Sequence, residues 1–221
     1  TWYHYFDQGY YGFAKQMAED IKRLPEIGLD GSIACQNIRV YYPTAFPLHA
    51  YAGYLWNPKT DFDALGKSYF EAAFGADGAL CREYMEKLSE LISFDHFYRS
   101  DRSNDNCYVA NYDGKQEEVV EKLLQIPKLT EEFRPVIERN LNHEDPVLAR
   151  SFSDLLLHSQ LVVLLSHALR AKAEGKDALA DEYWTELAQY IMISEEKLEA
   201  GLDFFWFFSA YENWIKMFKK R

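Results

Sequence analysis

Cysteine is scarce in this 221-residue sequence, and the three cysteines form no metal or disulfide pattern. Cys35, Cys81 and Cys107 are odd in number and far apart, without a Cys-x-x-Cys or mixed His/Cys spacing. Zinc sites and disulfide frameworks need such spacings. His158 and His167 have no ligand spacing either, so we interpret both as structural. We therefore expect no metal site and no cofactor.

Positive charge is also in short supply. Lys and Arg total 24 against 35 for Asp and Glu, a net charge of −11, and the only basic cluster is "KMFKKR" at residues 216–221. An acidic surface repels phosphate backbones and anionic membrane surfaces. No apolar run reaches the roughly 18 residues that span a bilayer. The sequence thus predicts no nucleic-acid partner and no membrane partner.

The first residues, "TWYHYFDQGY", lack an initiating methionine and the basic and apolar regions of a signal peptide. We interpret the chain as an excised fragment or a processed product.

Apolar residues are abundant, at 48% of the chain, and aromatic residues make up 16%. This composition is enough for one large core or for one and a half domains. Flat amphipathic rings suit sugar faces as well as ordinary cores.

Residues 1–57 have the pattern of a βαβ unit. Residues 1–6 are rich in aromatic side chains, as buried strands are, and residues 32–36 form a second short apolar run. Between them, residues 11–24 have apolar positions at helical spacing. Because this order belongs to a parallel sheet or barrel, we predict the C-terminal end of a (β/α)8, or TIM-type, barrel. Its earlier part would be absent from this chain.

The rest of the chain, residues 58–221, has the pattern of an all-α helical domain, so the expected fold class is mixed. Asp61 is the expected N-cap of its first helix, Gly75 the expected end of that helix, and Pro127 the end of a later one. Residues 93–115 are polar and rich in turn formers, which predicts a loop. The expected helices span residues 61–75, 77–91, 117–125, 130–140, 146–174, 177–200 and 202–219.

Polar residues follow both predicted strands. His4 and Asp7 lie at the end of the first, and Gln36, Asn37 and Arg39 follow the second. Ligand sites of barrels lie at the carboxyl ends of the strands. If the two strands are neighbours, these five side chains converge and could bind a polyol, because amides and guanidinium groups offer paired hydrogen-bonding groups. The alternative is that they cap the strands and hold the loops that follow.

Two further residues could complete a sugar site. His49 could reach it from the start of the helix after Pro47, although a lone histidine there is more often a packing or capping residue. Trp56 offers an apolar face. Glycoside hydrolysis needs two carboxyl groups, and only Asp7 lies near the predicted site. Asp7 is the catalytic candidate, but a helix cap is the more usual role of such an aspartate.

The motifs "GLDGSIACQ" and "LHAYAGYLWNPKTDFDALGKSYFEAAFGADGALCREYMEKL" resemble the bacterial family called domain of unknown function 4838, which is similar to α-glucuronidases and hexosaminidases. The resemblance covers residues 1–90, and Asn37 stands where such proteins often have glycine. It implies a (β/α)8 barrel followed by a helical domain. It also implies a carbohydrate-related role and a periplasmic or secreted location.

These observations lead to two hypotheses of function. In the first, the chain is the C-terminal part of a glycoside-hydrolase-like protein and binds a carbohydrate together with the remainder of the parent barrel or a second copy of the chain. In the second, it is a non-catalytic carbohydrate-binding or protein-interaction helical module. Five consecutive aromatic residues, 204–208, could hold a partner domain in that case. Burial in a helical bundle with several layers is the more ordinary explanation of this run.

Overall fold

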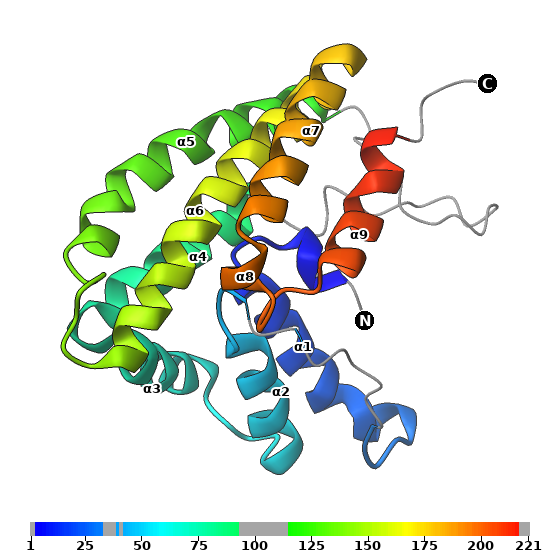
Figure 1. The fold of residues 1–221 in the computed structure, drawn as a ribbon. Helices are drawn as coiled ribbons and strands as arrows, with labels where there is room; N and C mark the ends of the chain where they lie inside the picture. The colour runs from blue at the N-terminus through cyan, green and yellow to red at the C-terminus, as the bar shows by residue number, and fades with distance from the viewer. Residues whose placement is uncertain (1–2, 33–38, 40–41, 93–114, 217–221) are drawn as a thin grey trace.

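The computed structural model describes residues 3–32, 39, 42–92 and 115–216, and all its regular elements are helical (Figure 1). The prediction of a barrel end is therefore wrong, and the described part of the chain is an all-α fold. Tyr3–Phe6, expected to be a strand, forms the 3-10 helix η1. The other expected strand, at residues 32–36, lies almost wholly outside the described residues.

The aromatic run at the N-terminus is buried by a helix from the far end of the chain. Tyr5 and Phe6 are 2% and 1% exposed. Tyr5 packs edge-on against Phe207, and Phe6 packs against Tyr211. Burial explains the apolar composition of this segment, and no sheet is needed to account for it.

The helices that follow are α1 (Tyr11–Arg23), η2 (Leu24–Ile27), α2 (Phe46–Trp56), α3 (Phe62–Phe74), η3 (Gly75–Asp77), α4 (Gly78–Leu91), α5 (Gln116–Glu138), α6 (Pro146–Ala173), α7 (Asp177–Ile193), α8 (Glu195–Leu198) and α9 (Phe204–Lys216).

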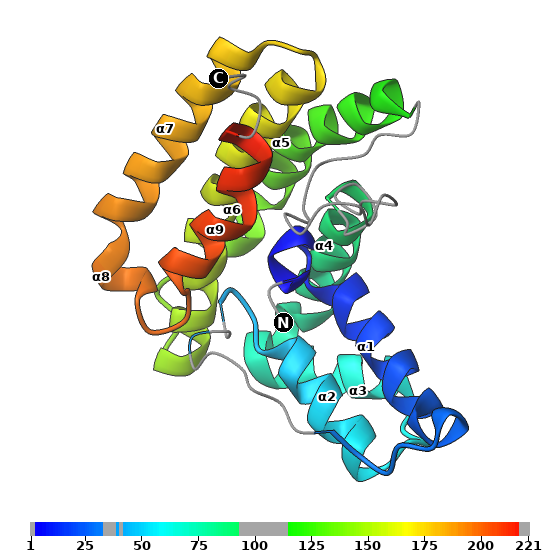
Figure 2. The same ribbon diagram turned by 90° about the vertical axis from the view of Figure 1, so that its right-hand side faces the viewer.

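The helices form two packed groups. The long helices α5, α6 and α7 lie side by side with α6 between the other two, and α1 to α4 form the second group (Figures 1 and 2). Helices α3 and α4 connect the groups by packing against α6 and α5. Helix α9 packs against α7, α6 and η1. This arrangement places the first and last described helices in contact.

Helix α6 is the centre of the core and matches the helix expected over residues 146–174. By length and composition alone it could cross a membrane, but 61% of its most apolar window is buried inside the protein. Phe152, Leu155, Val162 and Leu165 are all fully buried. A central helix covered on several sides needs apolar residues around most of its circumference. We therefore read its hydropathy as that of a core helix.

Two local signals of the sequence are confirmed, and one is wrong. The Asp61 carboxylate accepts a hydrogen bond from the Ala64 backbone N–H, and Gly75 ends α3 with a φ of 60°. Pro127, however, does not end a helix: α5 continues through it. The buried stripe of α5 runs across the proline, from Leu123 to Phe133, so packing against α6 outweighs the cost of the missing hydrogen bond.

The aromatic run at residues 204–208 is only partly buried. Phe207 is 1% exposed, whereas Phe205 is 67% exposed and its neighbours are intermediate. A single helix cannot turn five consecutive side chains toward one core. Burial of the whole run in a bundle was expected, and that expectation is wrong for Phe205.

The main core extends across residue 57. Tyr11 of α1 stacks on Phe46 of α2 with ring centroids 5.3 Å apart, and Phe46 contacts Phe70 of α3 at 5.4 Å. All three side chains belong to one apolar cluster that reaches α9. The assignment of residues 1–57 to a barrel is wrong. Whether residues 58–221 fold without them stays a prediction.

Candidate functional site

The predicted strand-end site loses its geometric basis. The end of the first strand does not exist, because η1 is a helix. His4 lies in η1, and its side chain is outside the described residues, as are Gln36 and Asn37. Arg39 is exposed. The expected convergence of these side chains therefore has no support in the described structure.

Asp7 holds the start of α1 from a buried position. Asp7 is 2% exposed, and its carboxylate accepts hydrogen bonds from the backbone N–H groups of Gly9, Tyr10 and Phe13 at 3.0, 2.9 and 2.5 Å. The Ser89 hydroxyl of α4 donates a fourth, at 2.7 Å. Burial raises the pKa of Asp7 to about 6, although the hydrogen bonds lower it. This is the geometry of a capping carboxylate, and no face of it is open to a substrate.

A second buried polar group lies next to Asp7. The Gln8 side-chain amide donates hydrogen bonds to the Tyr5 carbonyl oxygen and, at 2.9 Å, to the Tyr211 hydroxyl oxygen. Its Oε1 lies 3.3 Å from Nε2 of His158, which must then carry the proton of that ring. Burial lowers the pKa of His158 to about 3, so the ring is neutral.

The hydrogen bonds of Asp7 and Gln8 together connect η1 with α1, α4, α6 and α9. The rings of Tyr10 and Tyr42 pack against His158 with centroids 6.0 and 5.8 Å from it. Gln8 and His158 are 0% exposed. Because a substrate cannot reach them, we interpret the group as structural. Sequence reasoning gave His158 a structural role but missed Gln8, whose partners are 150 and 203 positions away.

Two of the predicted site residues do share an accessible surface. His49 and Trp56 are seven positions apart on α2, which is about 10 Å along a helix and close to two full turns. Both are exposed, and Ala52 is exposed between them. Trp56 is 91% exposed, the largest fraction among the exposed large apolar side chains of the described residues. We call His49, Ala52 and Trp56 the α2 face.

The α2 face is held by α3 and by the turn that follows α2. The Tyr69 hydroxyl of α3 accepts hydrogen bonds from the Ala45 N–H and the Thr44 hydroxyl, and its ring packs on His49 at 5.3 Å. After Trp56, the Asn57 side chain accepts a hydrogen bond from the Lys59 N–H. These contacts fix the His49 ring and the backbone at both ends of α2.

The remaining chemical signals are sparse. Within the described ranges, no three His, Cys, Asp or Glu side chains come together as a metal ion would need.

Comparisons with protein-family models, curated proteins and solved structures gave no match to this chain. The resemblance to the domain of unknown function 4838 family therefore stays a hypothesis.

Proposed function

We propose that this protein is a non-catalytic carbohydrate-binding module and that the α2 face is its sugar-binding surface. The observation that carries the proposal is Trp56, an indole ring exposed at 91% on the same face of α2 as His49 and Ala52. An exposed indole offers apolar area to a ligand, and covering that area is favourable by roughly 25 cal/mol per Å². The family resemblance favours a carbohydrate as that ligand.

The chemistry of the α2 face suits a sugar chain. An indole ring is flat and apolar, and it packs against the C–H face of a pyranose while its N–H remains available to a hydroxyl group. His49 supplies a donor and an acceptor about 10 Å away along the helix. Ala52 leaves the space between them open. Such a surface would bind a chain of sugars without enclosing it.

Affinity electrophoresis on gels that contain soluble polysaccharides tests the proposal. At least one polysaccharide should retard the native chain, and Trp56→Ala should weaken that binding about tenfold or more, roughly 1.4 kcal/mol. Phe205→Ala is the matched control, because Phe205 is an aromatic residue with 67% exposure on another helix. It should bind as the native chain does. Equal loss in both variants, or no retardation by any glycan in the panel, would contradict the proposal.

A further inference from the structure

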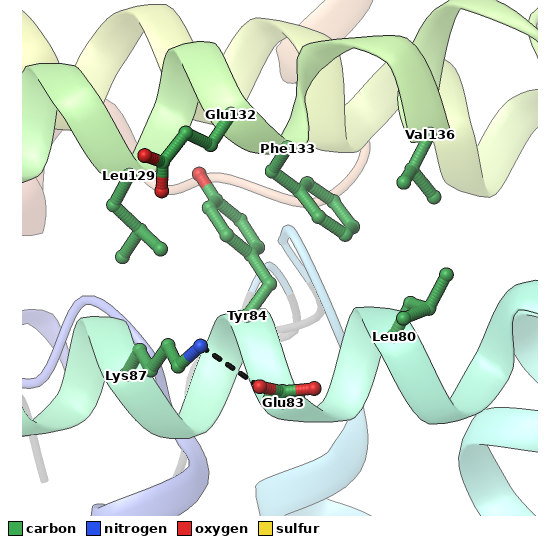
Figure 3. Close-up of a pocket in the computed structure, with 8 residues that line it drawn as sticks. All are labelled: Leu80, Glu83, Tyr84, Lys87, Leu129, Glu132, Phe133 and Val136. Atoms are coloured by element: carbon green, nitrogen blue, oxygen red, sulfur yellow. Dashed lines mark hydrogen bonds and ion pairs between the residues drawn. The ribbon is translucent and has the colours of Figure 1, made fainter.

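A groove runs between α4 and α5, on elements that do not contribute to the α2 face (Figure 3). Its volume is about 220 Å³, and it is open to solvent. Tyr84 of α4 and Phe133 of α5 stack across it with centroids 4.1 Å apart and planes 5° apart. The residues that line it are Leu80, Glu83, Tyr84, Lys87, Leu129, Glu132, Phe133 and Val136.

The lining residues have the spacing of a helix-packing surface. On α4, Leu80, Tyr84 and Lys87 follow one another at intervals of four and three positions. On α5, Leu129, Phe133 and Val136 repeat the same intervals. Two such stripes, side by side, form a seam into which one more helix can pack. Leu80 is still 43% exposed, so α4 and α5 do not complete this packing by themselves.

The size of the groove argues against a small-molecule site. Pockets for small molecules usually have roughly 300 to 1,000 Å³ and enclose most of the ligand. An open groove of this volume, lined by both apolar and charged side chains, is better suited to one or two apolar side chains that project from a helix. This is the geometry by which amphipathic helices bind to helical proteins.

The charges around the groove indicate the sign of the partner. The residues that line the groove carry two carboxylates, Glu83 and Glu132, against one ammonium group, Lys87. At the rim, Glu83 pairs with Lys87 at 2.8 Å and Glu132 with Lys128 at 3.7 Å, and the carboxylates of both pairs are more than half exposed. Exposed pairs of this kind contribute little to stability, so both carboxylates can also pair with a cation of a partner.

We propose that this groove is a docking site for a basic amphipathic helix of a partner protein. Apolar residues on one face of that helix would contact Leu80, Leu129 and Val136. Lysine or arginine residues beside them would pair with Glu83 and Glu132. The proposal does not depend on sugar binding, and the two surfaces can be tested separately.

Fluorescence anisotropy with a labelled synthetic peptide tests the proposal on the whole chain. The peptide has leucines at helical spacing on one face and lysines elsewhere, and we expect micromolar binding that weakens with salt. One control peptide carries glutamate in place of lysine. The other has the same composition in an order that does not gather the leucines on one face. Both controls should bind at least tenfold more weakly.

Three variants locate the binding. Leu80→Lys and Glu132→Lys should each weaken peptide binding at least tenfold. Glu196→Lys on α8 is the control, because it makes the same change of charge as Glu132→Lys away from the groove. It should change peptide binding less than twofold. Trp56→Ala should bind the peptide normally, which separates this proposal from the sugar site. Equal binding of the scrambled peptide, equal loss in Glu196→Lys, or no peptide binding at all would overturn it. If Leu80→Lys lowers the melting temperature, the peptide affinity of Glu132→Lys alone tests the proposal.

Discussion

Asp7 and His158 are two buried titratable residues whose effects on stability oppose each other. The carboxyl of Asp7 has a pKa of about 6 in the folded protein, raised by burial, against about 3.9 in an unfolded chain. It therefore contributes stability that is complete below pH 3.9 and is lost as the pH rises through 6. Burial lowers the pKa of His158 from about 6.5 to about 3, so its contribution is complete above pH 6.5 and falls toward pH 3.

Between pH 6 and 4 the folded protein holds one proton on Asp7 and the unfolded chain holds one on His158. We expect the two contributions to cancel, which leaves the free energy of unfolding independent of pH as far as this pair is concerned. In Asp7→Asn only His158 remains, and stability should fall by about 1.4 kcal/mol for each unit of decreasing pH. In His158→Gln the slope should have the opposite sign. Urea unfolding at several pH values measures both, and parallel curves for all three proteins would contradict this account.

Gly9, two residues before α1, lies against the backbone of α4. A Cβ atom at this position would lie 2.0 Å from the Met85 carbonyl oxygen and 2.3 Å from the Ser89 nitrogen, both backbone atoms. We expect Gly9→Ala to lower the free energy of unfolding by about 3 kcal/mol, because one helix must move away from the other. Gly31→Ala is the control, since a Cβ there would meet nothing within 4 Å. Similar urea midpoints for the two variants would show that this contact is not tight.

At the scale of the element, helix α5 shows packing that overrides a local signal. Pro127 and Pro135 both lie inside it. Leu123, Ile126 and Phe133 are buried on either side of Pro127 and keep one face toward the core. A proline-based rule divides this helix in two because the rule contains no information about α6. Such an error is expected wherever tertiary burial exceeds the roughly 3 kcal/mol cost of an interior proline.

Replacement of Pro127 should therefore stabilise the protein. Pro127→Ala supplies a backbone N–H that can donate to the Leu123 carbonyl oxygen, and it removes the clash of the proline ring with the preceding turn. We expect a gain of about 1 to 3 kcal/mol in the free energy of unfolding. Pro146→Ala at the first turn of α6 is the control, because proline costs nothing there, and it should not stabilise. A destabilised Pro127→Ala would mean that the ring itself fills space in the core.

Local signals predicted the elements that depend on nearby residues. The cap at Asp61, the end at Gly75 and the long apolar helix α6 were all evident in the sequence, because each is decided within a few turns of helix. The error at residues 1–6 has the opposite cause. Their composition fits a strand, but Tyr5 is covered by Phe207, about 200 positions away. His49 and Trp56 were chosen on a barrel argument that is wrong, and the structure nevertheless places both on one exposed face.

At the scale of the whole molecule, the N-terminal and C-terminal segments complete the same core. Tyr5 accepts, through its carbonyl oxygen, a hydrogen bond from the Tyr211 hydroxyl. Gln8 bonds to the same hydroxyl and to His158. Phe46 covers Phe70 of α3. The described residues up to position 57 are thus an internal part of the helical assembly, which the all-α pattern after residue 57 did not reveal.

Removal of residues 1–57 is the sharpest test of this organisation. The sequence pattern alone predicts that residues 58–221 remain a soluble helical domain. The structure gives the opposite expectation, because the deletion uncovers Phe70, Ser89 and Tyr211 and leaves His158 without its Gln8 partner. We expect residues 58–221 to keep much of their helical circular dichroism, to lose cooperative thermal unfolding and to bind the dye ANS, as loosely packed states do. The full chain should show one cooperative transition. If residues 58–221 instead unfold cooperatively without binding the dye, residue 57 is a true domain boundary and the shared core is dispensable.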